Sequence, residues 1–244
     1  MPEVLPILYQ DDWLVAIHKP SGLLTHRTDL DRHETRFAVQ MLRDQIGRRV
    51  WAAHRLDRGT SGILLFALSA EMAGAIGRQF EQGEVEKTYQ AIVRGHPPQT
   101  GLIDHPLSRQ RDAREWSGPD TGTEAQAAQT RFCCLGTAEL PCAIDRYPTS
   151  RYALLELEPL TGRRHQLRRH LKHIAHPIIG DATYGKGVHN RFFAEHFGCR
   201  RLLLAATRLA ITHPASKARL QMETPPAEDF LDVAAQLGWK TVGV

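Results

Sequence analysis

Short strand-like runs follow one another along most of this 244-residue chain, and their order restricts the fold more than any other feature. Apolar or alternating runs lie at residues 4–9, 13–17, 50–53, 63–68, 87–95, 128–136, 151–159, 201–212 and 219–224. Few helical segments separate these runs, whereas a parallel sheet needs a crossover, usually a helix, between its strands. We therefore expect an α+β fold with a mainly antiparallel central sheet and flanking helices.

Periodic apolar residues and cap residues predict four helices. They lie at about residues 35–45, 70–82, within 161–177, and at about 227–237. Ser69 is suited to cap the start of the second helix and Gly83 to end it. In the third, Leu167, Leu171 and Ile174 recur at helical spacing and predict its buried stripe. The polar segment 108–124 is expected to be a mobile loop.

The composition is that of an ordinary soluble globular protein, and no apolar run has the length of a membrane span. The N-terminal residues contain acids where a secretory signal would have basic and apolar regions, so we expect a cytoplasmic protein. The four cysteines form no CxxC pair. We expect them to be buried, reduced thiols rather than a disulfide framework.

The charges are distributed unevenly along the chain. Residues 161–220 carry twelve Lys and Arg against two acids, Asp181 and Glu195, which gives this segment a net charge of +10. The rest of the chain has a net charge of −6. This asymmetry favours a polyanionic partner such as nucleic acid, although a solvated basic surface is an equal alternative on charge alone.

One short motif, "HRLDRGTSG" at residues 54–62, combines a carboxylate with a nearby guanidinium. Asp57 stands between two strand-like runs, where a side chain can reach a cleft, and the small residues after it predict a turn. The positive charge of Arg55 favours the ionised form of a carboxylate nearby, and an ionised carboxylate can act as nucleophile or base. The alternative is that Asp57 only caps the turn.

Two other kinds of site remain open from the residues alone. Four histidines, His165, His170, His173 and His176, are spaced so that His170 and His173 could share a helix face and hold a metal, although no cysteine or carboxylate ligand lies near in sequence. Hydrolysis by two carboxylates would need a second acid, which the fold could supply from a distant position.

Several motifs in collinear order resemble those of the RluA-type pseudouridine synthase family. "HRLDxxTSG" resembles its signature, and "LYQDDWLVAIHKPSGLL" resembles its N-terminal hairpin and KPSG turn. "EKTYQAIVRG", "PLTGRRHQLRRHL…HPIIGD" and "RLLLAA…ITHP" resemble its later motifs. The resemblance covers nearly the whole chain. It implies the catalytic fold of that family and an isomerase that converts a uridine of RNA to pseudouridine.

The resemblance implies a role for five residues. Asp57 matches the catalytic aspartate, and Arg55 matches the arginine that holds the target nucleotide out of the RNA stack. Tyr89 matches the tyrosine that packs under the target base. Arg168 matches the basic partner of the aspartate, and Leu204 an apolar wall of the pocket.

The chemistry that the resemblance implies needs no cofactor or metal, because the isomerisation neither adds nor removes a group. One departure from the family concerns the pocket. Such sequences often read Leu-His-Ala where this chain has Leu204-Ala205-Ala206, so we expect one pocket contact to be missing.

The resemblance also narrows the choice of RNA. The hairpin starts at about Val4, so we expect residues 1–244 to form a single catalytic domain without an N-terminal accessory RNA-binding domain. "YPTSRY" and "HNR…HFG" are similar to the subgroup that acts on uridine 65 of tRNA. The alternatives are a dual-specificity or ribosomal-RNA member and, from another class, a non-catalytic basic RNA-binding protein. We expect a monomer that binds tRNA and does not bind a membrane.

Overall fold

A computed structural model describes residues 4–26, 34–108 and 124–239. The strands in these ranges are β1 Ile7–Gln10, β2 Leu14–Lys19, β3 Trp51–Ala52, β4 Ser61–Ala67, β5 Glu86–Arg94, β6 Thr100–Asp104, β7 Leu107–Ser108, β8 Ala125–Gln126, β9 Gln129–Leu140, β10 Ser150–Pro159, β11 Leu204–Thr212 and β12 Arg219–Glu223. The helices are α1 Ala38–Ile46, α2 Ala70–Gln82, α3 Gln166–His173, α4 Gly187–His196 and α5 Glu228–Gln236.

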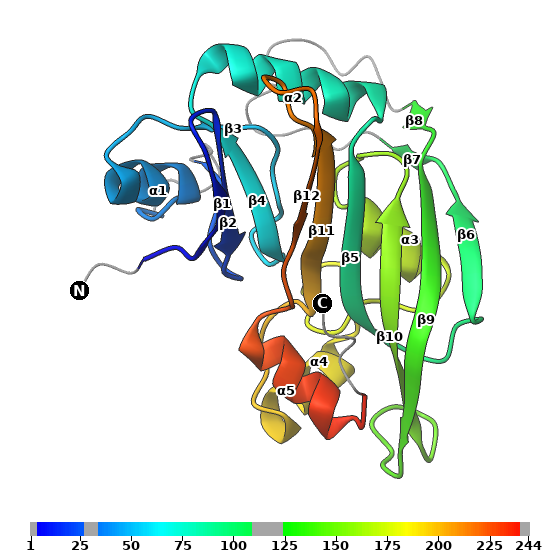
Figure 1. The fold of residues 1–244 in the computed structure, drawn as a ribbon. Coiled ribbons are helices and arrows are strands. Elements are labelled where there is room, and N and C mark those ends of the chain that lie inside the picture. The colour runs from blue at the N-terminus through cyan, green and yellow to red at the C-terminus, as the bar shows by residue number, and fades with distance from the viewer. Residues whose placement is uncertain (1–3, 27–33, 109–123, 240–244) are drawn as a thin grey trace.

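One large sheet runs through the described chain (Figure 1). Its strand order is β1-β2-β4-β11-β5-β10-β9-β6, with β3 paired to β4 and β12 paired to β11, while β7 and β8 form a separate pair. The pairings within the described strands are antiparallel except that of β4 with β11. The predicted α+β fold with a mainly antiparallel sheet is therefore confirmed.

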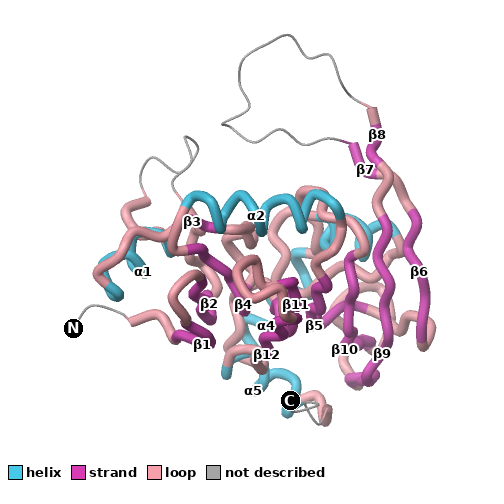
Figure 2. The backbone as a smooth tube through the Cα atoms, turned by 45° about the horizontal axis from the view of Figure 1, so that its top comes forward, coloured by secondary structure: helices cyan, strands magenta, loops and turns pink. Residues whose placement is uncertain are grey.

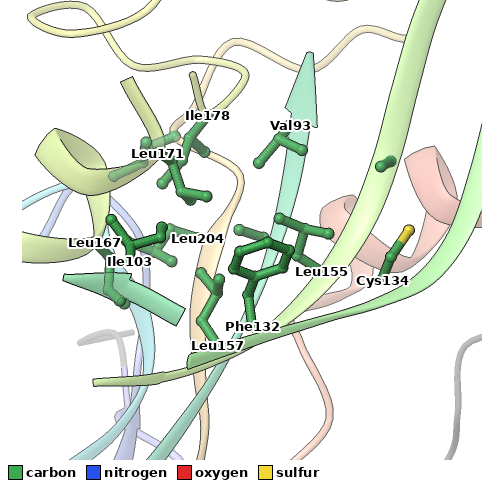
Figure 3. Close-up of a cluster of buried hydrophobic side chains, with 13 residues drawn as sticks. Val93, Ile103, Phe132, Cys134, Leu155, Leu157, Leu167, Leu171, Ile178 and Leu204 are labelled. Carbon is green, nitrogen blue, oxygen red and sulfur yellow. The ribbon is translucent and has the colours of Figure 1, made fainter. Parts of the chain in front are cut away.

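Helices cover both faces of the sheet. On one face, α3 packs through Leu167 and Leu171 on a buried cluster that includes Val93, Leu155 and Leu204 (Figure 3). On the other face, α4 and α5 pack on alternate residues of the same strands. Figure 2 shows α2 lying across one end of the strands. Because side chains of a strand alternate between faces, β5 and β10 are buried on both sides.

The predicted helices occur, with shifted ends. Ser69 caps α2 by accepting a hydrogen bond from the backbone N–H of Met72, and Gly83 ends it in the left-handed region. α1 begins at Ala38 rather than near residue 35, and α3 is limited to residues 166–173. Neither α4 nor β6 was predicted. The predicted loop at 108–124 lies outside the described residues, apart from its two end residues.

The cysteines differ in part from what the composition predicted. All four cysteines are free, but only Cys134 and Cys199 are buried, so the expectation that all four are buried was wrong for the half-buried Cys133 and Cys142. None of the helices in the described ranges combines the length and apolar character needed to cross a membrane.

Gly62 lies where the parallel pair β4–β11 brings two backbones together. Its φ is +104°, and a Cβ at this position would collide with the backbone oxygen of Ala206. We expect Gly62→Ala to lower the free energy of unfolding by more than about 4 kcal/mol, because strain and collision act together. Urea denaturation measures the effect. Gly74→Ala, inside α2, where a Cβ would meet only the end of the Arg78 side chain at an ordinary 3.7 Å, is the control and should stabilise by up to ~1 kcal/mol.

Candidate active site

The five residues that the resemblance singled out line one cleft of about 690 Å³. Arg55 and Asp57 come from the turn between β3 and β4, Tyr89 from β5, Arg168 from α3 and Leu204 from β11. These elements are far apart in sequence, but β4, β11 and β5 are adjacent in the sheet. The structure therefore brings all five side chains to the same place.

The backbone that carries Asp57 is held by the KPSG turn. Lys19 is fully buried, and its ammonium group donates to the carbonyl oxygens of Leu23 at 2.7 Å and Arg58 at 3.2 Å. Ser21 donates to the carbonyl of Gly59 at 2.7 Å. The Gly22 N–H donates to the Arg58 carbonyl at 2.8 Å. Two loops that are 35 residues or more apart are thus fixed to one another beside Asp57.

Arg168 joins Asp57 to a second, buried carboxylate. Its Nη1 donates to Oδ2 of Asp57 at 3.0 Å, while Nε and Nη2 donate to Asp181 at 2.7 and 2.9 Å. Burial opposes the charge of Arg168, but the hydrogen bonds and charge of Asp181, and then the charge of Asp57, raise the pKa of Arg168. The guanidinium therefore stays charged, and it donates a charge-assisted hydrogen bond to Asp57.

His165 faces the other oxygen of Asp57. Its Nε2 lies 3.8 Å from Oδ1, and its Nδ1 is hydrogen-bonded to the hydroxyl of Tyr184 at 3.0 Å. Burial lowers the pKa of His165 although the charge of Asp57 opposes this shift. Its φ of 54° is unusual for a residue with a side chain. The imidazole is therefore held neutral, close to the carboxylate, in a strained backbone position.

Tyr89 and Leu204 belong to the apolar part of the cleft, which Leu56, Phe80 and Leu167 also line. Tyr89 packs against the two buried clusters on this face of the sheet, and Leu204 lies in the first of them, near Leu167 (Figure 3). Burial, and then the negative charge of Asp57, raise the pKa of Tyr89, so that the phenol stays neutral. A neutral aromatic ring and an aliphatic wall next to a carboxylate suit a planar, uncharged group.

The lining of the cleft is rich in positive charge. Its Arg and Lys residues are Arg55, Lys87, Arg163, Arg164 and Arg168. Its acidic residues are Asp57 and Glu81. The basic segment 161–220 supplies three of these cations, and Arg55 and Lys87 come from the part of the chain that is acidic overall. The cleft suits a phosphate-bearing ligand.

The expected loss of a pocket contact at Ala205 was wrong. Ala205 pairs with Ser61 of β4 and Gln90 of β5, and it does not line the cleft, whereas the preceding Leu204 does. Successive side chains of a strand point to opposite faces. A histidine at position 205 would therefore point to the far side of β11.

The histidines that could have held a metal do not converge. His170 lies between Thr130 and the carbonyl of His105, and His176 lies against the carbonyl of Arg94. His173 stacks on the His105 ring at 3.6 Å. Among the residues that the structure describes, no group of three His, Cys, Asp or Glu is arranged to hold a metal ion.

The second carboxylate near Asp57 is not arranged for two-acid hydrolysis. Asp181 is 2% exposed, and both of its oxygens accept hydrogen bonds from Arg168. Glu156 and Glu158 line another groove, formed with β6 and β9. The described residues that line the cleft include one acid besides Asp57, which is Glu81 of α2.

Sequence reasoning missed several residues of this site, above all Asp181, Tyr184 and His165. One signal for Asp181 was available, because it is one of only two acids in the +10 segment. An isolated carboxylate among twelve cations is a candidate for an ion pair. No comparable signal marks Tyr184.

Comparisons with known proteins agree with this geometry. The family model described as "RNA pseudouridylate synthase" matches residues 13–173. The chain is 46% identical over 237 residues to a Vibrio cholerae protein named "tRNA pseudouridine synthase C", covering 97% of each chain. It is 49% identical to the Salmonella typhi protein of the same name, covering 97% of this chain and 91% of that one.

A solved structure is also similar. It is titled "Human RNA Pseudouridylate Synthase Domain Containing 1", with a TM-score of 0.71 and 26% sequence identity. The similarity covers 92% of this chain and 84% of the human one. The match thus extends over the sheet and the helices that form the cleft.

Proposed function

The chain belongs to the RNA pseudouridylate synthase family, and from this we propose that it converts uridine 65 of tRNA to pseudouridine with Asp57 as the catalytic carboxylate. The observation that carries the proposal is the cleft in which Arg168 holds Asp57 at 3.0 Å, beside Tyr89 and Leu204. The relatives named tRNA pseudouridine synthase C support tRNA as the substrate.

The reaction explains why one carboxylate is enough. The N1–C1′ bond breaks, the uracil turns, and a C5–C1′ bond forms, while C5 loses a proton and N1 gains one. Attack of Asp57 on the ribose, its attack on the base, and removal of a ribose proton all begin from an ionised carboxylate. Arg168 holds that carboxylate in place with a charge-assisted hydrogen bond. The atoms balance without a cofactor or a metal.

The remaining residues have roles in binding. A base inside a helix must leave the stack to react, which costs a few kcal/mol. In this proposal Tyr89 stacks under the base, Leu204 forms the apolar wall, and the exposed Arg55 occupies the space that the base leaves. Stacking and the inserted guanidinium offset the cost of unstacking.

We further propose that the protein is a cytoplasmic monomer with one domain, which catalyses the reaction. The ten-stranded sheet that runs through the described residues supports one domain, because its strands β5, β10 and β11 all contribute residues to the cleft. A cleft built by a single chain supports the monomer.

Site mapping tests the proposed function. The purified protein is incubated with unmodified tRNA and ribosomal RNA, and pseudouridine is mapped at single-nucleotide resolution. A single new pseudouridine at position 65 of tRNA is expected. The matched control is the same tRNA with cytidine at position 65, which should remain unmodified.

The other outcomes separate the alternatives. Modification of ribosomal RNA, alone or with tRNA, would replace the tRNA-specific proposal by the ribosomal or dual-specificity one. Tight, salt-sensitive binding of both RNAs without any pseudouridine would favour a non-catalytic RNA-binding protein.

Lys87 gives a prediction about binding. It lines the cleft two residues before Tyr89, where its ammonium group can reach a phosphate next to the target nucleotide. We expect Lys87→Ala to weaken tRNA binding about 5- to 10-fold and to reduce the slope of log Kd against log salt by about 1, since one phosphate contact is lost. Filter binding at several salt concentrations measures both. Lys186→Ala is the control, because Lys186 lies outside the cleft lining and pairs with Asp145; an equal effect there would contradict the prediction.

A further inference from the structure

We infer that the turn of residues 181–184 positions the Asp57 carboxylate from both sides, with Asp181 acting through Arg168 and Tyr184 through His165. The inference rests on the proposed function, because it concerns the same site. Neither Asp181 nor Tyr184 lines the cleft. Both are therefore positioning residues rather than catalytic ones.

Asp181 fixes the orientation of Arg168. It accepts from Nε at 2.7 Å and from Nη2 at 2.9 Å, and this leaves Nη1 directed at Asp57. Its Oδ1 also accepts the backbone N–H groups of Thr183 and Tyr184 at 2.9 Å. Four such bonds, together with a side chain that is only 1% exposed, hold the Asp181 carboxylate in one orientation. The Asp181 carboxylate in turn fixes the orientation of the Arg168 guanidinium.

Tyr184 supports the same arrangement through a second route. Its hydroxyl is hydrogen-bonded to Nδ1 of His165, which places Nε2 3.8 Å from Oδ1 of Asp57. Its ring also lies under the guanidinium of Arg168, 5.0 Å from ring centre to Cζ. One side chain thus contacts both residues that face Asp57. The strained φ of His165 requires such support, because an unsupported residue would relax.

The turn itself is fixed to the body of the protein. Asn190 of α4 accepts the N–H of Gly180 at 2.8 Å and donates to the carbonyl of Asp181 at 2.9 Å. A Cβ at Gly180 would collide with the carbonyl of Arg201, and one at Gly185 with the carbonyl of Asp181. The backbone is therefore packed too closely to shift, and this makes it a suitable base for positioning.

A double-mutant cycle tests the first route. We expect Asp181→Asn to lower the single-turnover rate on the order of 10- to 100-fold, with KM for tRNA changed less than about 2-fold, since a displaced guanidinium misplaces the reacting groups. In an Arg168→Ala background the same change should have no further effect on the rate. Equal losses in both backgrounds would overturn the inference, because Asp181 would then act without Arg168.

Tyr184→Phe tests the second route with a variant that removes only a hydroxyl. We expect a loss of about 5-fold in the single-turnover rate and none when His165 is already alanine. The control is Tyr152→Phe, which removes a buried hydroxyl bonded to His189, outside the cleft lining. This route would be overturned if Tyr152→Phe lowered the single-turnover rate equally. It would also be overturned if Tyr184→Phe caused the same loss in a protein that already carries His165→Ala.

A crystal structure of the Asp181→Asn protein supplies a readout that needs no activity. We expect the distance from Arg168 Nη1 to Asp57 Oδ2 to increase beyond about 4 Å, outside hydrogen-bonding range. A distance kept at 3.0 Å would overturn the inference even if the wild-type protein formed no pseudouridine. Absence of wild-type activity would instead count against the proposed function.

Discussion

We expect replacement of Asp57 with asparagine to abolish pseudouridine formation, with a loss on the order of 10⁴-fold or more. Asparagine has the same shape, and its amide oxygen can still accept the hydrogen bond of Arg168. It lacks the negative charge that attack or proton removal requires. Single-turnover assays on tRNA, with pseudouridine quantified by mass spectrometry, measure the loss.

Binding and folding should survive this substitution. Asp57 is 25% exposed and contributes one acceptor to the cleft, so we expect Kd for tRNA to change less than about 3-fold. Asp12→Asn, at an exposed position in the β1–β2 turn, is the matched control and should keep full activity. An Asp57→Asn protein with a tenth of the normal rate would exclude Asp57 as the catalytic carboxylate.

We expect Arg168→Ala to lower the single-turnover rate about 100- to 1000-fold, because the guanidinium no longer holds Asp57 in its reacting position. The same change should lower the free energy of unfolding by about 3–5 kcal/mol, since it leaves the buried Asp181 without its partner. Rate measurements well below the unfolding temperature and urea denaturation separate the two effects.

Two further variants make this prediction specific. Arg169→Ala changes the neighbouring arginine of α3, which donates to Ser108, and should leave the single-turnover rate within about 3-fold of normal. Adding Asp181→Asn to Arg168→Ala should restore much of the lost stability but none of the lost activity, because the buried charge is removed. A rate near normal in Arg168→Ala would show that Asp57 has another partner.

Much of the fold could be predicted where a local pattern has one structural meaning. The β1–β2 hairpin and the capped helix α2 are examples, because alternation, a turn and cap residues act within a few positions. α4 was not predicted, since its buried residues are His189 and Phe193, and a buried histidine gives no apolar signal. β6 is short and carries the exposed Leu102 at the sheet edge.

The residues of the candidate site could also be predicted only in part. The resemblance to a family selected Asp57, Arg55, Tyr89, Arg168 and Leu204, and the structure places all five on one cleft. The resemblance could not select Asp181, because Asp181 contacts the site through the side chain of Arg168, thirteen positions away in sequence. Only the folded structure brings these two side chains together. The Ala205 departure was misread for a related reason, since the face of a strand residue depends on register.

The position of β11 between β4 and β5 has a consequence for synthesis on the ribosome. Leu204 follows Ala67, the last residue of β4, by 137 positions and Arg94, the last residue of β5, by 110. At about 5–20 residues per second the two strands therefore wait roughly 5 to 30 s for their shared neighbour. During that time the edge of β5 that later pairs with β11 is unpaired, and an exposed strand edge is prone to association. Arg168 and Leu204 also join the cleft only late in translation. A nascent chain that ends before Leu204 therefore lacks part of the cleft lining and has no assembled site.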